Sequence, residues 1–179
     1  LGTNNNTSSA GWYVDSIALT GGGVAPNSAP MISAIDATPP TVTGTFTDLA
    51  VTATDDAAES ALTYTWSYTG GTFQTPVSFS LNGTNAAKNT RATFTGAGVY
   101  SFTITVTDAQ GLTATNGVDV TVDPVATSVA VAPATASISY GGMQSFSATE
   151  LDQFGAAVPA QPAFAWDSTG GGSIDANGL

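Results

Sequence analysis

The sequence predicts an all-β fold made of tandem β-sandwiches. In residues 98–107, apolar side chains alternate with Ser and Thr, and a strand with this period of two buries one face and exposes the other. Six further short segments with strand character lie within residues 31–123, and Gly, Asn, Pro and Asp mark the breaks between them. Seven short strands joined by turns are typical of two antiparallel sheets packed face to face.

The composition excludes several classes of function. The 179 residues include 13 acidic and 2 basic side chains, for a net charge of −11, and no His or Cys. Lys88 and Arg91 cannot form a basic stripe, so we expect no nucleic acid as a partner. No apolar run reaches the ~18 residues of a membrane span, so we expect no membrane insertion. Most nucleophilic triads and zinc sites need His or Cys, so we expect no enzyme and no catalytic residues.

The first segment, residues 1–20, contains one expected strand at 12–19, and residues 21–30 form a linker rich in Gly and Pro. One strand cannot bury its own face. We therefore expect residues 1–20 to be the terminal strand of a preceding β-sandwich, or to pack on a neighbouring chain. The sequence Gly-Trp-Tyr-Val-Asp at 11–15 resembles the last strand of the jelly-roll modules that follow the catalytic domain in secreted bacterial metallopeptidases.

The second segment, residues 31–123, is long enough for one complete sandwich of roughly 100 residues. Period-two patterns and turn residues predict strands at 31–35, 49–54, 62–68, 77–80, 91–94, 99–107 and 117–122.

Three motifs in this segment resemble the PKD and cadherin-like branch of the immunoglobulin-like sandwiches: Ala-Thr-Asp-Asp at 53–56, Leu-Thr-Tyr-Thr-Trp at 62–66, and the whole of 98–111. The resemblance implies a Greek-key sandwich in which Trp66 is the core tryptophan and Tyr100 forms a tyrosine corner. PKD modules often carry Trp-Asp-Phe-Gly-Asp-Gly on the third strand, whereas Trp66 is followed here by Ser-Tyr-Thr-Gly-Gly. This segment therefore resembles a divergent relative.

The last segment, residues 124–179, resembles the opening of a bacterial Ig-like module of the group-2 kind. An opening strand at 128–133, a Gly-Gly turn within 140–148, an Asp-Gln-Phe-Gly turn at 152–155 and a Trp-containing strand from 164 follow the family order. The segment has about 55 residues, where a complete sandwich takes roughly 100. We expect its second sheet to be incomplete, and to be completed by further residues or by another chain.

The candidate site is a set of carboxylates on two turns. Asp55, Asp56 and Glu59 follow the second predicted strand, Asp108 follows the sixth, and the family resemblance puts both turns at the same end. Ca²⁺ takes six to eight oxygen ligands. Resembling modules place calcium ligands at the Asp-Asp and Val-Thr-Asp positions, which implies a Ca²⁺ site at Asp55, Asp56 and Asp108, with Glu59 as a further ligand. The alternative is that these side chains cap backbone N–H groups of turns.

These features predict a non-catalytic structural or adhesive segment of a secreted or cell-surface bacterial protein, stiffened by calcium. The expected partners are neighbouring Ig-like modules, identical chains, or cell-surface or extracellular polysaccharide. Two alternatives stay open. One is the accessory region of a secreted hydrolase, a metallopeptidase or a glycosidase. The other is a filament subunit that assembles by strand addition between chains, since one end offers a lone strand and the other an unfinished sandwich.

Overall fold

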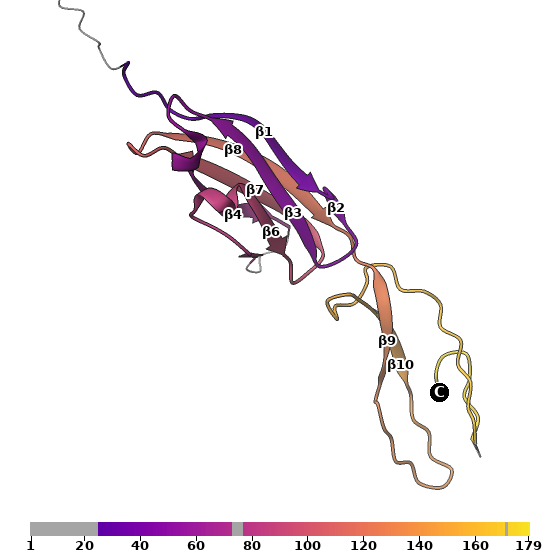
Figure 1. Ribbon diagram of the computed structural model, residues 1–179. Helices are drawn as coiled ribbons and strands as arrows, with labels where there is room; N and C mark the ends of the chain where they lie inside the picture. Colours follow the sequence, from indigo (N-terminus) through magenta and orange to yellow (C-terminus); the bar gives the residue numbers. More distant parts are fainter. Residues whose placement is uncertain (1–24, 73–76, 171) are drawn as a thin grey trace, which may run out of the picture.

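The computed structural model describes residues 25–72, 77–170 and 172–179 of the chain. It shows an all-β molecule, in which a β-sandwich of two four-stranded sheets is followed by a small two-stranded sheet (Figure 1). Helical structure in the described residues is limited to two short 3₁₀ turns, and none of it is long and apolar enough to cross a membrane. The expected strand at 12–19 and the segment at 1–20 lie outside the described residues.

The strand order of the sandwich is that of an immunoglobulin-like Greek key, as predicted. One sheet has the order β1-β3-β6-β5 and the other has the order β2-β8-β7-β4. All neighbours are antiparallel except β2 and β8. All seven predicted strands of this segment are confirmed, with ends that move by a few residues. The elements are β1 (Met31–Thr38), β2 (Thr41–Val42), β3 (Phe46–Thr54), η1 (Glu59–Ala61), β4 (Thr63–Gly71), β5 (Ser78–Phe79), η2 (Asn85–Lys88), β6 (Asn89–Thr93), β7 (Gly98–Thr107) and β8 (Thr113–Val122).

Strand β2 was not predicted, because two residues carry no periodic pattern. Pro39 and Pro40 have no amide N–H for a ladder, so the chain leaves the first sheet there and joins the second. The amide of Thr121 donates to the carbonyl of Pro40 at 3.0 Å, and the amide of Asp123 donates to that of Val42 at 2.8 Å. Strand β2 thus covers the edge of β8.

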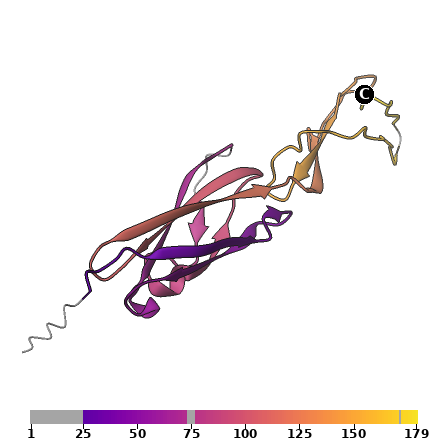
Figure 2. The same ribbon diagram turned by 90° about the horizontal axis from the view of Figure 1, so that it is seen from above.

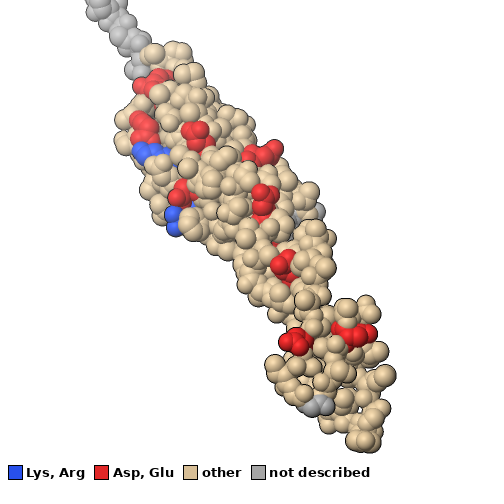
Figure 3. Space-filling model, turned by 90° about the vertical axis from the view of Figure 1, so that its right-hand side faces the viewer, with Lys and Arg blue, Asp and Glu red and all other residues tan. Residues whose placement is uncertain are grey.

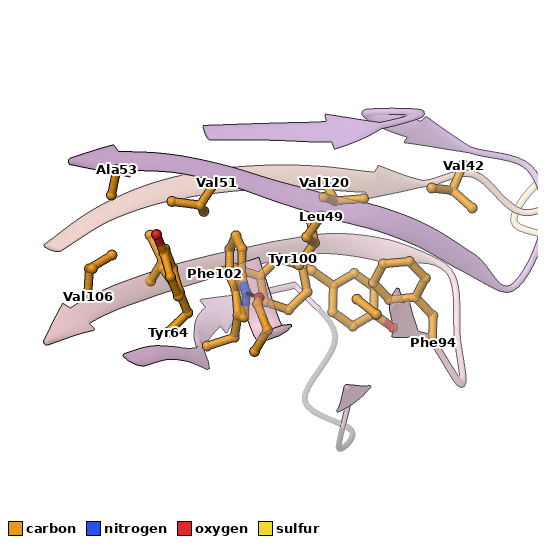
Figure 4. Close-up of a cluster of buried hydrophobic side chains, with 14 of the residues drawn as sticks. Val42, Leu49, Val51, Ala53, Tyr64, Phe94, Tyr100, Phe102, Val106 and Val120 are labelled. Carbon is orange, nitrogen blue, oxygen red and sulfur yellow. Dashed lines mark hydrogen bonds between the residues drawn. The ribbon is translucent and has the colours of Figure 1, made fainter. Parts of the chain in front are cut away.

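The core lies between the two sheets and is filled from alternate positions of facing strands (Figure 4). Trp66, on β4, is 2% exposed, and its indole N–H donates to the carbonyl of Ala87 at 2.9 Å. The predicted core tryptophan is therefore confirmed. The rings of Phe94 and Tyr100 pack with centroids 4.6 Å apart. The buried apolar core also contains Val42, Leu49, Val51, Ala53, Leu62, Tyr64, Ala92, Phe102, Ile104, Val106, Val120 and Val122.

The tyrosine corner is also confirmed. The hydroxyl of Tyr100 donates to the carbonyl of Gly96 at 2.7 Å, in a fully buried position. This bond fixes the loop between β6 and β7 to the strand that follows it. The loop forms part of the end of the sandwich from which the chain leaves toward residue 124.

The outer face of the β4-β7-β8 sheet carries cross-strand rows of hydroxyl side chains. Thr65 pairs with Thr105, which pairs in turn with Thr115 on β8. A second row contains Thr63, Thr107 and Thr113. These positions alternate with the buried ones, so the period-two pattern of the sequence separates an aromatic and aliphatic inner face from a hydroxyl-bearing outer face.

Residues 124–179 contain two strands in the described part, β9 (Ala126–Ala132) and β10 (Ser147–Asp152), which pair antiparallel. The strand expected from residue 164 is not formed, and residues 159–170 and 172–179 have no strand or helix. A second immunoglobulin-like sandwich is therefore not identified here, because no facing sheet covers the apolar side chains. Val129, Val131, Ile138, Tyr140 and Met143 are accordingly exposed.

Replacing Tyr100 with Phe is expected to lower the free energy of unfolding by about 1–3 kcal/mol, because the carbonyl of Gly96 loses its buried donor. Urea unfolding of the full chain, followed by tryptophan fluorescence, measures this difference. Tyr140→Phe is the matched control, because the side chain of Tyr140 is fully exposed and its variant should unfold like the wild type. Equal stability of wild type and Y100F would contradict a stabilising corner.

Candidate functional site: the acidic pole

The two acidic turns lie at the same end of the sandwich, which we call the acidic pole (Asn27, Ser28, Asp55, Asp56 and Asp108). The side-chain amide of Asn27 donates to Asp108 Oδ2 at 2.6 Å. The backbone amide of the next residue, Ser28, donates to Asp56 Oδ2 at 2.9 Å. Adjacent residues thus contact both turns, so the incoming chain lies across the pole. The expectation that the two turns share one end is confirmed.

Asp108 organises the turn between β7 and β8. Its Oδ1 accepts hydrogen bonds from the amides of Gln110 at 2.9 Å and Leu112 at 2.8 Å. The backbone closes the same turn, since the amide of Asp108 donates to the carbonyl of Leu112 at 3.0 Å. Gly111 has a φ of 92°, a left-handed conformation that favours glycine. One oxygen of this buried carboxylate is therefore committed to the turn, and Oδ2 faces the linker.

These contacts favour the ionised form of Asp108. The hydrogen bond from Asn27 lowers the pKa of the Asp108 carboxyl below its usual range, and the amides of Leu112, Gln110 and Gly111 lower it further. Burial acts in the opposite direction but does not outweigh the donors. At neutral pH the pole therefore holds a carboxylate whose charge is stabilised by amide donors.

Asp55 is the least satisfied carboxylate of the pole. Its Oδ2 accepts a long hydrogen bond of 3.4 Å from the amide of Ala57. Its Oδ1 is buried and has no hydrogen-bond partner among the described residues. A buried oxygen without a donor is costly, and such a position is normally satisfied by water or by a cation. Asp55 Oδ1 is therefore the atom of the pole with unused binding capacity.

Glu59 is engaged in a different network, which joins η1 to η2. Its carboxylate forms an ion pair with Lys88 at 3.0 Å and accepts hydrogen bonds from the Tyr64 hydroxyl at 3.0 Å and the Asn85 amide at 3.1 Å. The hydrogen bond from Lys88 lowers the pKa of Glu59, and those from Tyr64 and Asn85 add to the effect. Burial and the bond to Glu59 raise the pKa of Tyr64 to about 12. The carboxylate oxygens of Glu59 are thus occupied by local donors.

The fit of the pole to Ca²⁺ is partial. Among the described residues, no three side chains of the Asp, Glu, His or Cys type form a group that could hold a metal ion by themselves. The carboxylates of Asp55, Asp56 and Asp108 therefore do not make a Ca²⁺ site on their own, and an ion at the pole would need further oxygens from backbone or water. On the sandwich face seen in Figure 3, acidic side chains are spread along the length of the molecule as well as at the pole.

Sequence reasoning missed Asn27 and Ser28, which it assigned to a linker. The available signal was a polar pair placed just before the first strand of the sandwich. Asn and Ser at such a position can bond to a turn at the same pole, but the partner turns lie 28 and 81 residues away in the sequence. No local pattern connects residues at those separations.

Comparison with known proteins gives one family match. Residues 34–122 match the family model described as "K319L-like, PKD domain". No curated protein and no solved structure matches the chain. The matched segment begins within β1 and ends at the last residue of β8, so it covers nearly all of the sandwich.

The low pKa of Asp108 predicts acid sensitivity below about pH 4. Because the folded pKa lies below that of the unfolded chain, the contribution of Asp108 to stability is complete above the unfolded value. It is lost as the pH falls through the folded value. We expect the difference in melting temperature between wild type and Asp108→Asn to shrink between pH 5 and about pH 2.

Thermal unfolding by circular dichroism across this pH range measures the difference. Asp119→Asn is the control, because Asp119 is exposed on β8 and lies outside the pole. A difference between wild type and D108N that stays constant with pH would show that the charge of Asp108 contributes nothing to stability.

Proposed function

We propose, on the premise that residues 34–122 are a K319L-like PKD domain, that this chain is a non-catalytic structural segment of an extracellular, multidomain bacterial protein. The observation that carries this proposal is the match over nearly the whole sandwich, because PKD domains are typically non-catalytic modules of extracellular proteins. No catalytic domain is detected in this segment, and the chain has no His or Cys.

The positions of the two ends of the sandwich support a spacer role. The incoming chain crosses the acidic pole, and the outgoing chain leaves from the opposite end toward β9 (Figures 1 and 2). A module with its ends at opposite poles extends a chain by its own length. The alternative of an accessory region of a hydrolase rests on residues 11–19, which lie outside the described residues, so it gains no further support.

A calcium ion at the acidic pole is part of this proposal. Three observations support it: the buried Oδ1 of Asp55, which has no partner in the part of the chain that the structure describes, the ionised state favoured at Asp108, and the linker that lies across both turns. A cation held between the linker and the turns would reduce the motion of the incoming chain. Asp108 caps its own turn through Oδ1, while its Oδ2 accepts the hydrogen bond from Asn27, so a cation at the pole would share Oδ2 with the linker.

Calcium is expected to raise the melting temperature of the full chain by several degrees, because a ligand at about a hundred times its Kd stabilises the folded state by roughly 2.7 kcal/mol. The measurement is thermal unfolding in excess Ca²⁺ and in chelator. Asp108→Asn keeps an oxygen for the amides of Gln110 and Leu112, so it should retain the turn in chelator and lose most of the calcium-dependent rise.

Asp119→Asn is the control and should keep the full rise. A wild-type chain with the same melting temperature in both buffers would exclude the calcium site. The carboxylates would then act only as acceptors for turn and linker amides.

The exposed apolar side chains of residues 126–179 favour a second candidate, in which identical chains associate by strand addition. Val129 is 52% exposed and Val131 is 44% exposed, both on β9. In the described residues β9 pairs only with β10, so its other edge can accept a strand from another chain.

For this candidate, sedimentation velocity should give a mass that rises with protein concentration, and Val129→Lys should restore a monomer. Thr115→Lys is the control, because it adds the same charge to an exposed strand position of the sandwich. A wild-type chain that stays monomeric at every concentration would exclude strand addition and leave the spacer role.

A further inference from the structure

Within the residues that the structure describes, the same turn is built three times from the sequence Asp-x-x-Gly. In each turn, Oδ1 of the aspartate accepts the amides two and four residues later, and its backbone pairs with the residue four positions on. The glycine at the fourth position has a φ of 92°, 79° or 82°. The three turns begin at Asp108, Asp152 and Asp175.

The tips of these turns differ in exposure. The two tip residues after Asp108 and the two after Asp175 are exposed, as expected for a hairpin end. Gln153 and Phe154, the tip residues after Asp152, are both half-buried. Since the turn geometry is the same, the difference comes from a neighbour. That neighbour is the base of the sandwich, defined as the loops at 43–45 and 95–98 together with residues 121–125.

The side-chain amide of Gln153 forms hydrogen bonds to the backbone of the base and of the connecting segment through both its nitrogen and its oxygen. Its Nε2 donates to the carbonyl of Asp123 at 2.9 Å and to that of Gly44 at 3.3 Å. Its Oε1 accepts the amide of Val125 at 2.8 Å. One side chain thereby joins three stretches of chain: the loop before β3, the end of β8 and the start of β9.

Phe154 supplies the apolar part of the same contact. It packs against the hydrophobic core of the sandwich, at the end where the loop at 95–98 meets residues 121–124. The Tyr100–Gly96 bond holds that loop in place. An aromatic ring at a turn tip is normally exposed to water, so its burial here favours one position of the turn on the base.

We propose that the base of the sandwich is a docking surface for the Gln153–Phe154 tip, and that this joint fixes the angle between the PKD domain and the segment that follows it. The base is recognised mainly through backbone carbonyls, so the partner that fits it is a β-hairpin whose Asp-x-x-Gly turn carries Gln followed by an aromatic residue. The hydrogen bonds of Gln153 to the base use backbone groups only. This joint goes beyond the proposed spacer function, because the contact between the tip and the base does not depend on calcium at the acidic pole.

The test measures the distance between the two parts of the full chain. The sequence contains no Cys, so Thr65→Cys and Ser128→Cys introduce unique sites for nitroxide labels at exposed positions. Double electron–electron resonance in chelator then gives the distance distribution. Gln153→Glu places a carboxylate against two carbonyls, and Phe154→Ser removes the ring. Gln110→Glu makes the same change at the exposed tip of the Asp108 turn and serves as the control.

We expect one narrow distance peak for wild type and for Q110E, and a broad distribution for Q153E and F154S. The unfolding midpoint of the sandwich in each variant reports whether the PKD domain is still folded. A broad wild-type distribution would overturn the fixed joint. Narrow distributions in folded Q153E and F154S would overturn the role of the tip. Neither result depends on calcium, so failure of the joint is distinguishable from failure of the proposed calcium site.

Discussion

The packing of Trp66, Tyr100 and Phe102 between the two sheets is the interaction on which the other features depend. Aromatic side chains of this kind bury 150–250 Å² each, on the order of 5 kcal/mol of apolar burial before the entropy of ordering is counted. The indole N–H of Trp66 and the hydroxyl of Tyr100 bond to carbonyls outside the strands, in η2 and in the loop before β7. The same rings that hold the sheets together thus also hold η2 and the loop between β6 and β7. The aromatic core is thereby tied to η2 and to the loop that forms part of the base.

The fold could be predicted from the sequence where burial alternates residue by residue. β7 is the clearest case, because Tyr100, Phe102, Ile104 and Val106 all point to one side. Strand β2 could not be predicted, since its pairing is decided by two prolines and by a neighbour 80 residues later. In residues 124–179 the family pattern predicted a Trp-containing strand. It does not form in the described residues, because a strand needs a partner sheet as well as a suitable sequence.

The candidate site was less predictable than the fold. Asp55, Asp56 and Asp108 were identified from turn position and family resemblance, but the linker residues that contact them were not. Glu59 shows the limit most clearly. In the sequence Glu59 lies close to Asp55 and Asp56, yet in the fold its carboxylate forms an ion pair with Lys88, 29 residues later. With 13 acidic and 2 basic side chains, both cations of this chain are paired, Lys88 with Glu59 and Arg91 with Asp48. Which carboxylates stay unpaired is decided only by the tertiary fold.

The rows of threonine on the outer face of the β4-β7-β8 sheet hydrate that face without adding net charge. Hydroxyl groups bind water without carrying charge, so their hydration is not screened by dissolved ions, whereas the attraction between exposed charges falls off within about 10 Å at 0.1 M salt. Thr105 and its neighbours lie on the same face as the exposed carboxylate of Asp119. Their hydration does not depend on charge, so salt that screens the carboxylates does not act on this part of the surface through screening.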